Sequence, residues 1–221
     1  MPDTDSYFRA ARALMVDGQV RPNNVIDDRI VTAMRTLRRE RFVPAALALR
    51  AYADTDLPLG GGRVLPSPLT IGKLAHFAAI RPGERVLVIG AGTGYGAALI
   101  ASCGGAVFAL EEDAALRALA EPALSAEAPE VRLIAGPLAE GDAKHAPFDL
   151  IVIEGGAEFL PETLAAQLAP DGRLIAILYE RGLGRIVRAE PSGGGFAHRA
   201  LADCNASPLA AFRRKPEFIF R

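Results

Sequence analysis

The sequence predicts an α/β fold with a mostly parallel, doubly wound sheet. Three observations support this. Strand-like and helix-like segments alternate from residue 85 to about residue 179, as in folds built from βαβ units. The predicted strands are apolar at nearly every position, as expected when helices cover both faces of a sheet. The first of them, RVLVIG, runs directly into the glycine-rich turn at residues 90–94, a typical beginning for a nucleotide-binding α/β core.

Two helices are predicted within the first 55 residues, from apolar side chains spaced three and four apart. Their apolar faces contain Phe8, Ala11, Leu14 and Met15 in the first helix and Ile30, Val31, Met34 and Leu37 in the second. Asp27 or Asp28 is expected to cap the second helix. The solvated side of this region is expected to include Arg35, Arg38, Arg39 and Arg41.

Residues 56–75 are predicted to form a loop with imposed turns, because LPLGGGRVLPSP contains three glycines and three prolines. Pro68 is well suited to the first position of a helix. A helix is therefore expected over residues 69–79.

The remaining elements can be assigned in chain order. Strands are predicted at RVLVIG, AVFALE, VRLIAG, FDLIVIEG and GRLIAILYE, and helices at YGAALIAS, DAALRALAEPAL and PETLAAQLAP. Pro122 is expected to interrupt the second of these helices. After Tyr179, GRIVRAEPSGGGFAHRAL predicts two strands joined by a glycine-rich hairpin, and EFIF (217–220) a short closing strand. These last strands are expected to be antiparallel additions.

Length and composition suit one domain over residues 1–221, with N-terminal helices and a loop in 1–80 and the core in 81–221. The net charge of −1 gives no basic excess, so no nucleic-acid partner is expected. The uncharged run at residues 86–110 is as long as a membrane span, but its six glycines favour a strand, turn, helix and strand. With no signal-like N-terminus, a cytoplasmic protein without membrane segments is expected. Cys103 and Cys204 have no metal-ligand spacing, and no metal is expected.

The turn after the first predicted strand indicates a nucleotide site. Gly90, Gly92 and Gly94 would let a ligand lie against bare backbone at a helix N-terminus. Glu111 follows about 20 residues later at the end of the second strand, where a carboxylate accepts hydrogen bonds from ribose hydroxyls. Two alternatives stay open: tight packing without a ligand, and a nicotinamide or flavin enzyme, since Gly92-x-Gly94-x-x-Ala97 satisfies G-x-G-x-x-A.

Several stretches together resemble one family, the protein-L-isoaspartate O-methyltransferases. The order and spacing match over MVDGQVRP (15–22), DDRIVTAM (27–34), RRERFVP (38–44), AYADTDLPLGGG (51–62), VLVIGAGTGYGAALIA (86–101) and APFDLIVIEGGAEFLPETLAAQLAPDGRLI (146–175). The resemblance implies a Rossmann-like, S-adenosylmethionine-dependent methyltransferase fold, with a seven-stranded sheet and an N-terminal helical extension. It also implies methylation of isoaspartyl side-chain carboxylates in peptides or proteins, as part of protein repair.

The resemblance also implies site residues. Those implied at the cofactor are Gly90, Ala91, Gly92, Thr93, Gly94, Tyr95, Glu111, Glu112, Gly136, Pro137, Leu138, Glu154 and Gly155. Those implied at the acceptor are Leu59, Gly60, Val64, Leu65 and Pro66. Glu154 also stands out by position, because it ends an apolar strand at the carboxyl edge of the sheet, where ligands bind. It is expected either to contact an amino group of the cofactor or substrate, or to cap a helix or loop.

The chain departs from the family pattern in the acceptor loop. The family has a Thr-Ile-Ser run where this sequence has Val64, Leu65 and Pro66, so its hydroxyls are missing. Ser67 is the remaining candidate for a catalytic hydroxyl, and it is also placed to cap the helix that begins at Pro68. Pro137 replaces an acidic residue at the adenine, and Val88 replaces a glutamate. The acceptor is therefore expected to be an isoaspartyl residue or another carboxylate, with a non-catalytic cofactor-binding or regulatory protein as the alternative.

Overall fold

The structure is a computed structural model, and it describes residues 4–214. The α-helices are α1 (Thr4–Met15), α2 (Asp28–Thr36), α3 (Pro68–Ala78), α4 (Tyr95–Ser102), α5 (Ala114–Glu127) and α6 (Glu162–Ala165). The strands are β1 (Leu57–Gly60), β2 (Arg63–Leu65), β3 (Arg85–Ile89), β4 (Ala106–Glu111), β5 (Arg132–Ala135), β6 (Phe148–Ala157), β7 (Leu168–Glu180), β8 (Leu183–Ser192) and β9 (Gly195–Asp203). One turn of π-helix, Val16–Val20, continues α1 directly.

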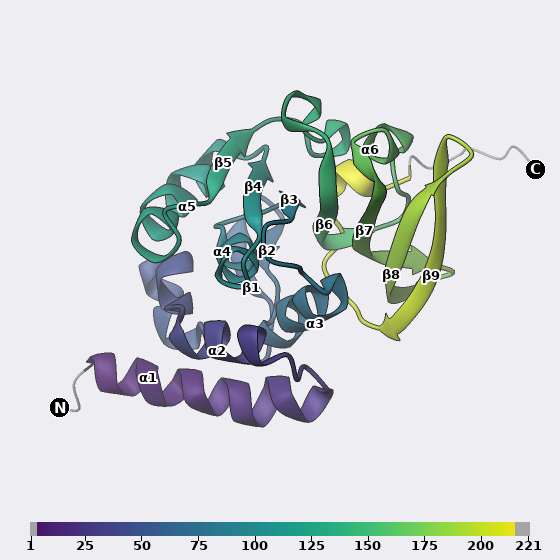
Figure 1. The fold of residues 1–221 in the computed structure, drawn as a ribbon. Helices are drawn as coiled ribbons and strands as arrows, with labels where there is room; N and C mark the ends of the chain where they lie inside the picture. Colours follow the sequence, from purple (N-terminus) through teal and green to yellow (C-terminus); the bar gives the residue numbers. More distant parts are fainter. Residues whose placement is uncertain (1–3, 215–221) are drawn as a thin grey trace, which may run out of the picture.

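Seven strands form the central sheet, in the order β5-β4-β3-β6-β7-β8-β9 (Figure 1). The strands from β5 to β7 are parallel, whereas β8 and β9 are added antiparallel. The predicted α/β fold, with a mostly parallel sheet and an antiparallel end, is therefore confirmed. The chain proceeds from β3 to β4 on one side and later to β6 on the other, so the sheet has a topological switch point between β3 and β6. In open α/β sheets ligands bind at such a point.

Alternate residues of the central strands enter two separate hydrophobic cores, one on each face of the sheet. In β3, Val86 and Val88 join the core that also contains the N-terminal helices, α3, α4 and α5. Leu87 and Ile89 face the opposite core, which is covered by short segments that include α6 and Phe212. The N-terminal helices therefore share one hydrophobic core with the sheet; the single domain over residues 1–221 stays a prediction.

The strand register brings three predicted site residues to one edge. Ile89 of β3 pairs with Leu110 of β4 and with Ile153 of β6. The residues that follow these three, Gly90, Glu111 and Glu154, therefore lie side by side at the carboxyl edge of the sheet.

Two predictions for the N-terminal region are wrong. Leu14 is 73% exposed, because the core-facing stripe of α1 runs through Phe8, Ala11 and Met15, and Leu14 lies about 100° away from Met15. Arg39 is completely buried instead of solvated. It follows the end of α2 and begins a short 3₁₀ helix, Arg39–Phe42, so the α-helical spacing does not apply to it. The predicted Asp27 cap is confirmed, since its side chain accepts from Arg29 N.

The predicted loop at residues 56–75 contains an antiparallel hairpin made by β1 and β2. Gly60, Gly61 and Gly62 all have positive φ angles, which glycine adopts without steric penalty. They form the tight connection of the hairpin. The helix predicted after it is confirmed as α3.

Two predicted helices differ from the structure. Pro122 does not interrupt α5; it lies on the exposed side, where water can bind the carbonyl that proline leaves without a partner. The helix predicted at PETLAAQLAP shortens to α6, four residues long. The closing strand predicted at EFIF lies outside the described residues. Across residues 4–214, no helix combines the length and the apolar composition that a membrane crossing requires.

Candidate functional site

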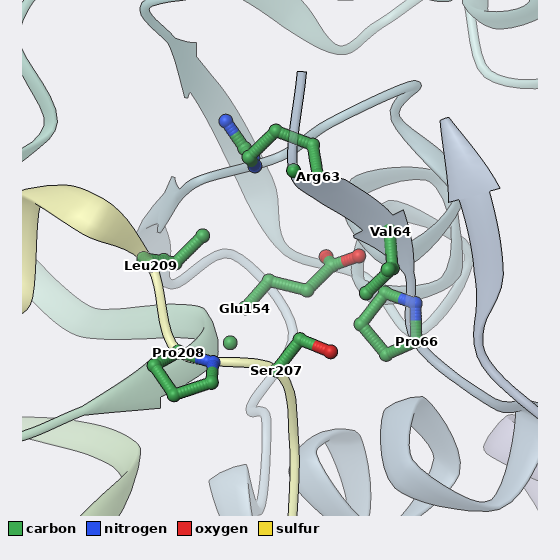
Figure 2. Close-up of a pocket in the computed structure, with 9 residues that line it drawn as sticks. Arg63, Val64, Pro66, Glu154, Ser207, Pro208 and Leu209 are labelled. Carbon is green, nitrogen blue, oxygen red and sulfur yellow. The ribbon is translucent and has the colours of Figure 1, made fainter. Parts of the chain in front are cut away.

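A small cavity lies at the switch point of the sheet (Figure 2). Three segments line it: the β1–β2 hairpin with Pro66, the end of β6 with Glu154 and Gly155, and residues 207–209 of the C-terminal segment. Its volume of about 10 Å³ is roughly what one water molecule needs. The candidate site is therefore nearly closed by its own side chains.

Glu111 is fixed at the end of β4 and is completely buried. Its Oε2 accepts a hydrogen bond from Gly92 N at 2.7 Å, and its Oε1 accepts one from Asp113 N at 3.0 Å. One of these donors belongs to the glycine-rich turn and the other to the start of α5. The carboxylate that the sequence predicts for a ribose is thus oriented by the backbone on both sides.

Arg63 also holds Glu111, through a two-pronged ion pair. Arg63 Nη1 lies 2.7 Å from Glu111 Oε1, and Arg63 Nη2 lies 2.8 Å from Glu111 Oε2. The same Nη2 donates to Gly90 O at 3.2 Å. Such paired hydrogen bonds between charged groups are among the strongest in proteins. A ribose can reach the side of the carboxylate now held by Arg63 only by displacing that guanidinium.

The glycine-rich turn has the backbone that the sequence predicts. Gly90, Gly92 and Gly94 have φ angles of 75°, 57° and 94°. Leu209 covers Gly90 and Gly155: a Cβ atom at either glycine would lie within 3 Å of the Leu209 side chain. Leu209 is fastened to the end of β6 by a hydrogen bond from its N–H to Gly156 O at 2.9 Å. A ligand that touches either glycine therefore requires the Leu209 side chain to move.

Glu154 lies in the cavity wall and is only 6% exposed. No described residue donates a hydrogen bond to its carboxyl group, which lies so close to Gly96 that a Cβ atom there would clash with it. Burial raises the pKa of Glu154 to about 8, against the opposing influence of the Arg39 and Arg63 guanidinium groups. Glu154 caps neither a helix nor a loop.

Arg39 and Tyr95 form a buried pair behind this carboxyl group. The guanidinium carbon of Arg39 lies 4.6 Å from the centre of the Tyr95 ring, and Arg39 donates to Ala51 O at 2.7 Å and to Pro66 O at 2.6 Å. Burial lowers the pKa of Arg39 and raises that of Tyr95. Arg39 thereby ties the acceptor loop to the N-terminal region.

Two residues predicted at the cofactor point away from the cavity. The Thr93 hydroxyl donates to Phe42 O at 2.6 Å, and the Tyr95 ring packs edge-on against Phe42, with ring centres 5.5 Å apart. Ala91 contributes backbone, since its N–H bonds to Leu110 O at 3.1 Å. These residues shape the turn from behind.

Four further residues predicted at the cofactor lie at the ends of β4 and β5. Glu112 is exposed, and its Oε2 accepts from Leu138 N at 3.4 Å. Gly136 and Pro137 precede the buried Leu138 in a short connection. This group is separate from the cavity, which it does not line.

The residues predicted at the acceptor divide into two sets. Val64 and Pro66 line the cavity, and Leu59 reaches over the glycine-rich turn at Gly92. Leu65 is buried in the core beneath the hairpin, and Gly60 is exposed at its tip. The cavity therefore receives apolar groups where the family pattern has hydroxyls.

Ser67 acts as the cap of α3 in this structure. Its Oγ accepts from Thr70 N at 3.2 Å, and its own N–H donates to Asp56 Oδ1 at 2.9 Å. Ser67 is absent from the cavity lining. The geometry favours the capping role over the catalytic one, which stays a prediction.

Five residues of the cavity wall were not predicted from the sequence: Gly62, Arg63, Ser207, Pro208 and Leu209. For Arg63 a signal existed, because a lone cation in a loop expected near a carboxylate substrate is a candidate partner for an acid. The three C-terminal residues lie about 50 positions after Glu154, and no sequence spacing links them to it.

Comparisons with known proteins identify the chain's relatives. The family model for protein-L-isoaspartate(D-aspartate) O-methyltransferase matches residues 11–210. A protein-L-isoaspartate O-methyltransferase from Methylorubrum populi is 42% identical over 166 residues, covering 75% of this chain and 78% of the relative. Another from Koribacter versatilis is 35% identical over 203 residues and covers 91% of each chain.

Solved structures share the fold. A putative protein-L-isoaspartate O-methyltransferase from Plasmodium falciparum, in complex with S-adenosyl-L-homocysteine, superimposes with a TM-score of 0.74 at 20% identity, covering 90% of this chain and 98% of that one. The predicted Rossmann-like methyltransferase fold is confirmed, and so is the predicted dependence of the family on S-adenosylmethionine. This chain belongs to the protein-L-isoaspartate(D-aspartate) O-methyltransferase family.

Proposed function

We propose that this protein transfers a methyl group from S-adenosylmethionine to the side-chain carboxylate of an L-isoaspartyl residue in a peptide or protein. The observation that carries the proposal is Glu111, buried at the switch point and oriented by Gly92 N and Asp113 N. A carboxylate held there beside a glycine-rich turn is the arrangement that binds the ribose of a nucleotide cofactor.

The residues around Glu111 fit the cofactor in their chemistry. The positive φ angles of Gly90, Gly92 and Gly94 leave open backbone, and α4 begins at Tyr95 with its first N–H groups free of intrahelical partners. Pockets for ligands of this size usually measure several hundred Å³, far more than this cavity. The fit therefore has one condition: the side chains of Arg63 and Leu209 have to move aside.

Methyl transfer requires the protein to orient the acceptor carboxylate toward the methyl group and to exclude water from it. S-adenosylmethionine, when bound, would supply a methyl group on a positively charged sulfur, and that sulfur would keep the electron pair of the broken bond and leave as a neutral thioether. An acceptor carboxylate has an ordinary pKa near 4 and is already ionised at pH 7, so no general base is required. Val64, Pro66 and Leu209 present apolar groups that exclude water from the acceptor. Orientation of this kind can supply a large part of a rate enhancement.

The test is a methylation assay with labelled S-adenosylmethionine. A synthetic peptide with one L-isoaspartyl residue should acquire a base-labile methyl ester, whereas the same peptide with ordinary L-aspartate should not. No ester above background on the isoaspartyl peptide, from protein shown to bind S-adenosylhomocysteine, would favour the non-catalytic alternative. The family assignment supports methyl transfer and gives no support to the nicotinamide alternative.

The proposed partners are isoaspartyl-containing peptides and proteins, and the proposed location is the cytoplasm. The absence of a nucleic-acid partner, expected from the net charge of −1, stays a prediction. A filter-binding measurement with mixed RNA and DNA at low salt would test it.

A further inference from the structure

Two polar side chains of the cavity wall, Glu154 and Ser207, are not used by the proposed chemistry. The Ser207 hydroxyl already donates to Asp56 Oδ2 at 3.2 Å, which leaves the carboxyl group of Glu154. It is 6% exposed, lines the cavity and receives no hydrogen bond from any described residue. Burying a carboxyl group without partners costs free energy of folding. A group of this kind facing a cavity indicates that its partner is a ligand.

The groups around Glu154 come from five segments of the chain. Arg39 on the N-terminal side and Arg63 of β2 are the nearby cations, and Glu111 of β4 is the nearby anion. Arg63 is paired with Glu111, and Arg39 donates from Nε and Nη2 to the carbonyls of Ala51 and Pro66. Arg39 Nη1 and the Tyr95 hydroxyl are buried without a hydrogen-bond partner among the described residues, so neither is bonded to Glu154. From α4 the contact is Gly96, and from the C-terminal segment it is residues 207–209, which carry no charge.

This environment favours the uncharged form of the carboxyl group. Burial dominates over the two guanidinium groups and raises the pKa of Glu154 to about 8, so at pH 7 most molecules hold the proton. An uncharged carboxyl group differs from a carboxylate in that it can donate an O–H hydrogen bond. A carboxylic acid kept neutral in an apolar site is a known way to hold an oxyanion.

The position of the group suits the acceptor. Figure 2 shows the carboxyl group of Glu154 directed toward Val64 and Pro66. These are two of the positions at which hydroxyl-bearing residues of the family pattern are replaced here by apolar ones. The cavity therefore lacks hydroxyl donors from the loop and has one acidic donor on the opposite wall.

We propose that Glu154 holds the acceptor carboxylate by donating its own proton in a hydrogen bond to it, taking over the task of the missing loop hydroxyls. This inference rests on the proposed function, since it assigns the residue that positions the isoaspartyl side chain. It makes Glu154 a positioning residue whose activity depends on pH. Above pH 8 the lost proton leaves two carboxylates facing each other, and the acceptor is repelled.

The first experiment asks whether Glu154 holds a proton, and it needs neither cofactor nor acceptor. Infrared spectra of the wild-type protein are compared with those of Glu154→Gln between pH 6.5 and pH 9. A carboxylic-acid carbonyl band should fade with a midpoint near pH 8 in the wild type and be missing in the variant. Glu162→Gln, which removes an exposed carboxyl group at the start of α6, should keep the band. Absence of the band in the wild type would overturn the proposal.

The second experiment measures binding of an isoaspartyl peptide to the S-adenosylhomocysteine complex by calorimetry. Between pH 6.5 and pH 9 the wild-type affinity should fall, because the bound form requires the Glu154 proton. The fall is about tenfold for a pKa of about 8, the value that Glu154 has while Arg63 is paired with Glu111. The affinity of Glu154→Gln, whose amide donates at any pH, should not change with pH. Glu154→Leu should bind the peptide at least about fivefold more weakly at pH 6.5.

The outcomes separate two failures. A peptide affinity that is the same at both pH values in the wild type overturns the role of Glu154 while leaving the proposed function in place. Peptide binding that is absent at every pH, in protein that binds S-adenosylhomocysteine and shows the infrared band, overturns the proposed function and the acceptor role together.

Discussion

Two buried glutamates lie at the same edge of the sheet, on β4 and β6, the two strands that flank β3. Their surroundings differ. Glu111, at the end of β4, receives four hydrogen bonds, two from Arg63 and one each from Gly92 and Asp113. Glu154, near the end of β6, receives no hydrogen bond from the described residues, although only 6% of it is exposed. Two residues of the same type at the same sheet edge therefore differ: Glu111 has hydrogen-bond partners for both oxygens, and Glu154 has none among the described residues.

The difference shows how a site can divide its tasks. A carboxylate held by backbone N–H groups and a guanidinium stays charged and rigid, which suits the recognition of sugar hydroxyls. A buried carboxyl group without hydrogen-bond donors keeps its proton and can donate a hydrogen bond to a ligand. The hydrogen-bond donors around a glutamate, and not the residue type, therefore decide whether it is charged or holds a proton. The following predictions test this contrast.

The largest effect is expected from Glu111→Ala. Loss of the carboxylate should weaken S-adenosylhomocysteine binding about 100-fold, since charge-assisted hydrogen bonds contribute roughly 1.5–3 kcal/mol each. It should also lower the free energy of unfolding by about 3–5 kcal/mol, because Arg63 keeps a buried charge without its partner. Calorimetry and urea unfolding measure the two.

A double variant, Glu111→Gln with Arg63→Met, controls for misfolding because it removes both charges together. Glu121→Ala, an exposed position on α5, should behave as the wild type in both measurements. Unchanged affinity for S-adenosylhomocysteine in folded Glu111→Ala would show that the cofactor site has been placed wrongly.

The second effect concerns stability and pH, and it comes from Glu154→Gln. In the unfolded chain this glutamate loses its proton near its ordinary pKa of 4.5, whereas in the folded protein it does so at about 8. Between these values the unfolded state binds fewer protons than the folded state, so the wild type loses stability as pH rises from 4.5 to 8. The variant lacks this loss, and its advantage should grow by about 3 kcal/mol between pH 5 and pH 8.

Urea unfolding of both proteins at pH 5, 6, 7 and 8 measures this difference. Glu162→Gln serves as the matched control, with no growing advantage expected. If the advantage of Glu154→Gln stays constant across the series, Glu154 is ionised in the folded protein and the contrast with Glu111 fails.

The third effect is expected from Arg63→Met. In this variant the ribose of S-adenosylhomocysteine no longer has to displace a guanidinium from Glu111. The affinity for S-adenosylhomocysteine should therefore rise about tenfold, equivalent to roughly 1.4 kcal/mol. Calorimetry at two salt concentrations measures it, with Arg199→Met on β9 as an exposed arginine control. If Arg63→Met bound S-adenosylhomocysteine more weakly than the wild type, Arg63 would contact the cofactor. The proposed displacement of Arg63 would then be wrong.

The smallest effect is expected from Ser67→Ala. Loss of the cap of α3 should lower the free energy of unfolding by about 1 kcal/mol, with methylation rates changing less than about twofold. Ser67→Asp should restore the cap and the stability. A rate loss on the order of 100-fold in Ser67→Ala, the magnitude typical of a lost orienting group, would instead support the catalytic role.

Much of the fold follows from local patterns. Apolar runs of strand length, the glycine turn and the Ser67-Pro68 helix start predict β3 to β7 and α3 correctly, because each is a short-range signal. The errors lie where neighbours in space decide. Pro122 stays within α5 because its side of the helix is exposed, and Arg39 is buried because Ala51 and Pro66 offer carbonyl partners.

The family, the parallel sheet, the glycine-rich turn and Glu111 at the end of its strand could all be predicted from the sequence, because each depends on spacing along the chain. Three features required the folded chain: Arg63 holds Glu111, Leu209 covers Gly90 and Gly155, and Glu154 is buried without a hydrogen-bond partner among residues 4–214. Each of these depends on chain segments that are about 50 residues or more apart in the sequence. Folding decides the burial and the hydrogen-bond partners of each carboxyl group, and these in turn decide whether the group is charged.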